Sequence, residues 1–106
     1  MMYEAAIPIH VALSGPDADL GEAIGNVTNQ LAVIDESTPE LLDYAVSSDA
    51  ADNSVLFEIT LDADDDLQAL AAAVSWVRAA IHATGGNTPG WTLEEGVNVS
   101  LLASAA

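Results

Sequence analysis

The chain has 106 residues, about half of them hydrophobic, which is enough for one domain with a core of its own and too little for two. Seventeen acidic residues against one arginine and no lysine give a formal net charge of −16, which argues against binding DNA, RNA or an anionic membrane face. The absence of cysteine excludes a disulfide framework and thiolate chemistry.

The first segment alternates between two faces and predicts a strand. Its apolar face carries Ala5, Ile7, Ile9, Val11 and Leu13. Pro8 lacks the N–H that a central strand donates to its neighbour, so we expect a bulge or an unpaired edge there.

A turn over residues 14–17 then leads into a helix expected over residues 17–32. Apolar residues recur along it at helical spacing: Leu20, Ile24, Val27 and Leu31. Gly21 and Gly25 lie one turn apart, where the lack of side chains would allow another backbone to approach closely. Residues 32–40 read as a connection that stops at Pro39.

Two strands and a hairpin loop follow. Alternation predicts a strand with Leu42, Tyr44 and Val46 inward, a loop over residues 49–53, and a second strand with Val55, Phe57, Ile59 and Leu61 inward. The second of these strands alternates most clearly, so we expect Phe57 and Ile59 to be buried against the helix that comes next.

An acidic cluster opens that helix and consists of Asp62, Asp64, Asp65 and Asp66. It resembles a calcium loop only at first sight, because an EF-hand needs Gly at position six and Glu at position twelve, where this chain has Leu67 and Ala73. The cluster therefore indicates a capped helix N-terminus, and no metal site is expected. The inward stripe of the helix is predicted to be Leu67, Leu70, Val74, Val77 and Ile81.

Arg78 and His82 lie near the end of this helix, where cations are favoured, and Gly85-Gly86 stops it. The last strand should run over residues 91–101, with a bulge at Glu95 and Gly96. The order is β-α-β-β-α-β, the ferredoxin-like α+β unit: a four-stranded antiparallel sheet, first and third strands central, with two helices on one face.

Two surfaces are candidate interfaces. One is the sheet face away from the helices, with His10, Leu56, Glu58 and Leu102; the other is an alanine-lined face of the second helix around Trp76. A two-fold homodimer through either surface is expected at moderate salt. No catalytic residue, cofactor or phosphate-binding loop is indicated, since the serines lack an elbow motif and no P-loop lysine exists.

The charge favours a first hypothesis: a small non-enzymatic inhibitor, encoded by a phage or mobile element, that occupies the basic surface of a host protein. The alternative is a dimeric ferredoxin-like domain that binds a small molecule or acts as a cofactor-poor enzyme, with His10 and Trp91 as candidate contacts. A third explanation of the acidity is the composition of salt-loving organisms. In each case we expect a single domain over residues 1–106, without a membrane span, in the cytoplasm of its producer or host.

Overall fold

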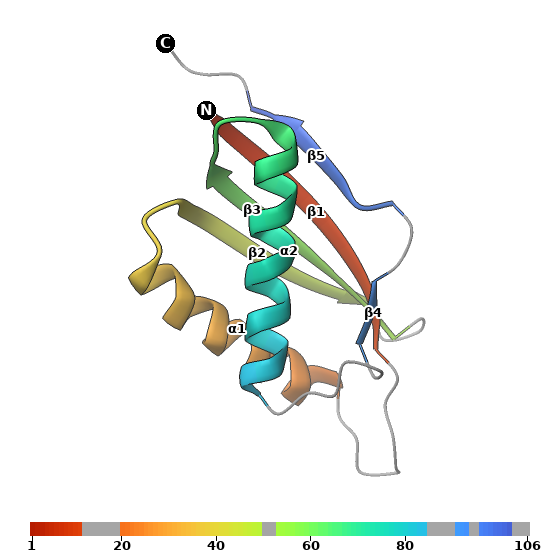
Figure 1. Ribbon diagram of the computed structural model, residues 1–106. Helices are drawn as coiled ribbons and strands as arrows, with labels where there is room; N and C mark the ends of the chain where they lie inside the picture. Colours follow the sequence, from red (N-terminus) through yellow and green to blue (C-terminus); the bar gives the residue numbers. More distant parts are fainter. Residues whose placement is uncertain (12–19, 50–52, 85–90, 94–95, 103–106) are drawn as a thin grey trace.

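The computed structural model describes residues 1–11, 20–49, 53–84, 91–93 and 96–102 (Figure 1). In these residues the elements are β1 (Met2–Val11), α1 (Leu20–Ser37), β2 (Leu41–Asp49), β3 (Ser54–Asp62), α2 (Asp66–Ala83), β4 (Trp91–Leu93) and β5 (Asn98–Leu101). The antiparallel sheet has the order β2-β3-β1-β4, and β5 pairs with the other half of the same edge of β1. Both helices lie on one side of this sheet (Figure 1), so the predicted ferredoxin-like fold is confirmed.

The two central strands supply half of the buried hydrophobic residues that the structure describes. Their registers place Ile7 opposite Phe57 and Ala5 opposite Ile59, so that the inward residues of both strands form adjoining rows. All of these inward residues are buried: Tyr3, Ala5, Ile7, Ile9, Val11, Val55, Phe57, Ile59 and Leu61. The period-two alternation therefore predicted the inward face of both strands correctly over these residues, and Leu13 lies outside the described ones.

Pro8 lies in a central strand, and the hydrogen bonding of β1 explains how the sheet accommodates it. The Met2 carbonyl accepts the Leu102 N–H at 2.9 Å on the β5 side, and alternate residues of a strand point the same way. The nitrogen of Pro8 therefore faces the edge shared by β4 and β5. The pairing with β5 ends at Ala6 and the pairing with β4 begins at Ile9, so neither register reaches Pro8.

The expected last strand is two separate strands, not one strand with a bulge. The pairing with β4 ends where Leu93 lies opposite Ile9, and the pairing with β5 begins where Asn98 lies opposite Ala6. Four residues separate the two strands in the sequence but only two separate these positions on β1, which is too large a difference for continuous pairing. Gly96 in this stretch has φ of 99°, a left-handed conformation that favours glycine. The sequence located the interruption correctly and underestimated its size.

β2 begins one residue earlier than predicted and contains a bulge. Its register shifts between Leu41 and Asp43, so Leu41 is buried whereas Leu42 is 48% exposed. After the bulge, Tyr44 and Val46 return to the inward side as predicted, opposite Ile59 and Phe57. Leu42 as an inward residue was a wrong prediction, because a bulge changes the parity of every residue before it.

α1 continues to Ser37, through residues that were predicted to be a connection. Ile34 extends the apolar stripe by one turn beyond Leu31, and the Ser37 hydroxyl donates to the Ile34 carbonyl at 3.2 Å. Of the predicted stripe, Val27 and Leu31 are fully buried and Ile24 packs against the core, whereas the side chain of Leu20 lies outside the described residues. Gly25 is exposed with open space where a Cβ would stand, so the expected close backbone approach is absent there. The predicted first turn, before residue 20, lies outside the described residues.

α2 begins as predicted and is rotated relative to the predicted stripe. Asp65 is the N-cap, and its carboxylate accepts the Gln68 N–H at 2.7 Å. Leu67 is 73% exposed, whereas three alanines are fully buried beside Val77 and Ile81: Ala69, Ala73 and Ala80. Small side chains allow α2 to lie close to the sheet and to α1 at once, and that contact determines which face is buried.

Neither α1 nor α2, as described, has the length and apolarity that crossing a bilayer requires.

Candidate functional site

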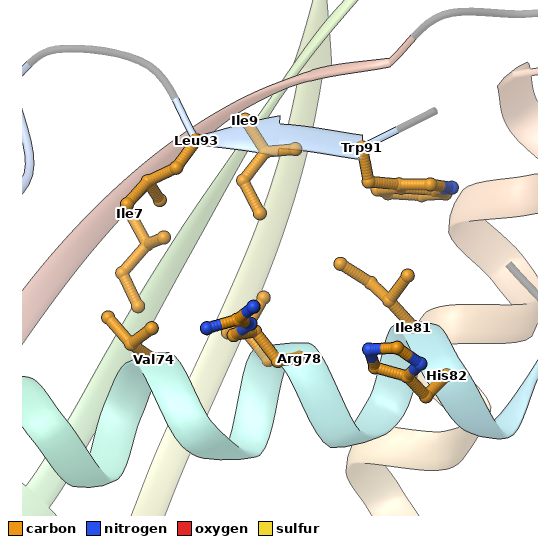
Figure 2. Close-up of a pocket in the computed structure, with 9 residues that line it drawn as sticks. Ile7, Ile9, Val74, Arg78, Ile81, His82, Trp91 and Leu93 are labelled. Atoms are coloured by element: carbon orange, nitrogen blue, oxygen red, sulfur yellow. The ribbon is translucent and has the colours of Figure 1, made fainter. Parts of the chain in front are cut away.

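A cleft of about 310 Å³ lies between α2 and the sheet edge formed by β1 and β4 (Figure 2). On the sheet side it is lined by Ile7 and Ile9 of β1 and by Trp91 and Leu93 of β4. The register explains this wall: Leu93 pairs with Ile9 and Trp91 pairs with Val11, so both β4 side chains share the inward face of β1. Ile7 and Ile9 form a buried floor, whereas Trp91 is half-buried and Leu93 is exposed.

The opposite wall comes from two rows of residues on α2. One row contains Val77 and Ile81, and the other contains Val74, Arg78 and His82. Residues four apart lie on one face of a helix, so the second row places two nitrogen-bearing side chains beside an apolar floor. In Figure 2 the Arg78 side chain stands on the side of α2 that faces β1, and Trp91 lies above Ile81.

The charge of this cleft is opposite to that of the chain. Among the described residues, the nine that line the cleft include no acidic side chain, although the chain has seventeen acidic residues. The sequence has no lysine and a single arginine, Arg78. The side chain of Arg78 is exposed and lines the cleft. Within the described ranges no carboxylate forms an ion pair with Arg78.

The acidic cluster at the start of α2 has structural roles. Asp65 caps the helix, the Asp64 N–H donates to Gln68 Oε1 at 2.7 Å, and Asp62 pairs with the amino group of Met1 at 2.8 Å. Asp66 occupies the first turn, where a negative charge is favourable. In the part of the chain that the structure describes, no three His, Asp or Glu residues are grouped so as to hold a metal ion.

Tyr3 lies near this cluster and is buried on the inward face of β1. Burial raises the pKa of the Tyr3 hydroxyl above its usual value, and the carboxylates of Asp66, Asp65 and Asp64 raise it further. Both causes act against the phenolate, because an anion loses solvation on burial and is repelled by nearby negative charge. Tyr3 is therefore a structural residue that remains protonated to high pH.

The sheet face away from the helices brings three of the predicted interface residues together. His10, Leu56 and Glu58 alternate with the buried residues of β1 and β3, and this places them on the open face. His10 is exposed, and the other two side chains are half-buried. Leu102 follows β5 and is half-buried, and its N–H bonds to β1. Their role as an interface stays a prediction.

Trp76 does not lie on a flat, exposed alanine face. It is half-buried against the core, and the alanines expected around it are mostly covered. It lines a separate recess together with Ala72, Glu40 and Asp64. The predicted platform is wrong because the alanine side of α2 is the side that packs.

Sequence reasoning named Trp91 as a contact for a small molecule but assigned Arg78 and His82 only to the helix end. The spacing of Val74, Arg78 and His82 was the available signal, since it places all three on one face. Periodicity could not show that this face borders β4, because β4 is positioned by its pairing with β1, at the other end of the chain. His10, the other candidate contact, lies on the opposite face of the sheet from the cleft.

No family model matches this chain, and neither does any curated protein. Among solved structures, the chain is similar to the crystal structure named "putative Antibiotic biosynthesis monooxygenase" from Chloroflexus aurantiacus J-10-fl. The TM-score is 0.60 at 17% sequence identity, and the alignment covers 100% of this chain and 97% of the other. The similarity establishes the shared fold over the whole chain.

The fold match and the cleft contradict the first hypothesis, an acidic phage-type inhibitor of a basic host protein. They fit the alternative, a ferredoxin-like small-molecule domain, because the fold is similar to that of a protein named as a biosynthetic enzyme and the chain has a cleft of about 310 Å³. The charge misled the prediction because net charge governs solubility and association, not the activity of a fold.

Proposed function

We propose that this chain is a small-molecule-binding domain whose ligand lies in the cleft between β1, β4 and α2. The observation that carries the proposal is the cleft itself: an apolar floor, one aromatic wall and two polar side chains at a volume of about 310 Å³. Ligand sites in proteins are typically concave, mostly apolar and provided with a few polar groups that fix orientation. Ile9 and Trp91 would contact the apolar body of the ligand.

The structural neighbour supports the same class of function. Its printed name describes an enzyme of antibiotic biosynthesis, a process that acts on small organic molecules. At 17% identity no individual residue role transfers to this chain, since fold alone does not imply function. The neighbour therefore supports only the class of function, a small-molecule domain. The candidate contact residues are inferred from the lining of the cleft.

A second candidate function is a cofactor-poor enzyme acting on the same ligand. The neighbour's name as a monooxygenase favours it, and the cleft contains His82, a residue type often used as a general base. Loss of turnover in His82→Gln with unchanged ligand affinity would support this candidate. An equal loss of ligand affinity and turnover would show that His82 contributes to ligand binding and not to the chemical step.

The binding proposal is tested by titrating the protein with 1-naphthol, a neutral two-ring probe, while recording amide and indole NMR signals. We expect shifts confined to the cleft, including one of the two tryptophan indole signals; Trp76→Phe assigns the other. Val74→Trp should fill the cleft and abolish these shifts. Ser75→Trp adds the same side chain at the neighbouring exposed position and should leave binding unchanged. Shifts spread over the surface, or insensitive to Val74→Trp, would refute the proposal.

The open sheet face is our proposed site of homodimer formation. Its centre combines the small apolar side chains of Ala6 and Pro8 with Leu56, and Glu58 lies directly opposite Ala6. Burial of the apolar centre would favour association, and charge repulsion would oppose it except at moderate salt. Sedimentation at about 0.5 M NaCl, where the screening length is below about 8 Å, is the test. A monomer would refute this assignment.

A cytoplasmic location stays a prediction. So does the explanation of the acidity as the composition of a salt-loving organism.

A further inference from the structure

We infer that the cleft selects a small carboxylate with an apolar body, and that Arg78 binds the carboxylate group. This inference rests on the proposed function, since it names the chemical class that the same cleft would accept. It follows from three observations: the distribution of charge, the position of Arg78 and the size of the cleft.

Charge is distributed unevenly over this molecule. Two other recesses of this chain are lined in part by carboxylates, one by Glu40, Asp62 and Asp64 and the other by Asp49. The described lining of this cleft instead contains the arginine and His82 and no acidic residue. Repulsion by distant carboxylates is screened beyond about 8 Å at 0.15 M salt, so an anion in the cleft experiences mainly its immediate neighbours.

The position of Arg78 suits recognition of an anion at the mouth of the cleft. It is exposed and lies one turn from Val74 and from His82, so its guanidinium stands between an apolar side chain and an imidazole. No carboxylate within the described residues occupies its donors. The planar guanidinium presents a fork of N–H groups that matches the two oxygens of a carboxylate.

The rest of the cleft determines the body of the ligand. Ile7, Ile9 and Ile81 offer only apolar surface, and the ring of Trp91 provides a flat wall on which an aromatic ring can stack. The volume of about 310 Å³ is at the lower end of the range of about 300–1,000 Å³ that ligand pockets occupy. A body of one or two rings fits this space.

The test compares 1-naphthoate with 1-naphthamide, which have the same rings and differ in charge, by calorimetry at about 0.15 M NaCl, where distant charges are screened. The variants are Arg78→Gln, Arg78→Lys and Asn29→Asp. Asn29 is exposed on α1, and Asn29→Asp changes the net charge by the same amount as Arg78→Gln without touching the cleft. Thermal melting of each variant confirms that it is folded.

We expect wild type and Asn29→Asp to bind the carboxylate about tenfold more tightly than the amide, as a charge-assisted hydrogen bond would produce. Arg78→Gln should remove this preference while leaving amide affinity within about twofold, and Arg78→Lys should keep part of it because it retains the charge. Equal binding of both probes by wild type would overturn the inference and leave the proposed function standing. Failure of both probes to bind would refute the proposed function, and the inference with it.

Discussion

Substitutions at Leu67 and Ala73 distinguish the α2 face that the sequence favours from the face that the structure buries. Leu67 is 73% exposed, so about a quarter of its side chain is covered. Full burial of a leucine contributes about 1.5–3 kcal/mol, and a quarter of that is about 0.4–0.8 kcal/mol. Leu67→Ala should therefore lower the free energy of unfolding by less than about 1 kcal/mol, helped by the higher helix propensity of alanine.

Ala73 is fully buried, so the reverse change should be the damaging one. Ala73→Leu adds three carbon atoms where α2 is packed, and overpacking of this kind costs about 1–3 kcal/mol. Urea denaturation followed by circular dichroism at 222 nm measures both variants. Ser75→Leu, at an exposed position of the same helix, controls for the leucine itself.

The opposite result would refute the packing described for α2. If Leu67 were a core residue, Leu67→Ala would cost about 2–5 kcal/mol. If Ala73 were at the surface, Ala73→Leu would change stability by less than about 0.5 kcal/mol. That pair of outcomes would restore the stripe that periodicity predicts.

Three further predictions follow from the helix, the buried tyrosine and the charge. Gly25→Ala should stabilise the protein by about 0.5–1 kcal/mol in urea denaturation, because the position is exposed within α1 with open space around a new Cβ; destabilisation would mean that α1 is wrongly placed. Because the pKa of Tyr3 is raised in the folded state, the unfolded chain loses this proton first, and stability should fall as the pH rises above about 10. Tyr3→Phe should remove that part of the alkaline loss and the late phase of tyrosine ionisation at 295 nm; an unchanged alkaline profile would contradict the burial of Tyr3. The melting temperature should rise by about 4–8 °C between about 0.01 and 0.15 M NaCl if screening removes about 1 kcal/mol of repulsion, and a flat profile would show that the carboxylates do not repel one another measurably.

The sequence alone determined those features that depend on neighbouring residues. Alternation in β1 and β3 marked Ile7 and Phe57 as inward, because side chains of a strand point to opposite faces at every step. The aspartates before α2 marked a helix start, because a short carboxylate satisfies free N–H groups within one turn. These signals are local and need no knowledge of the partner element.

Tertiary structure alone decided how the elements meet. Pro8 could be judged only once the break between β4 and β5 was seen opposite it, and the buried face of α2 depended on how closely α2 approaches the sheet. The cleft is the strongest case, because Ile9 comes from β1, whereas Arg78 and Trp91 come from α2 and β4, most of the chain later. A local pattern shows which face of an element is apolar. Contact between distant elements is set by the packing of the whole core, and the cleft exists only because β1, α2 and β4 are in contact.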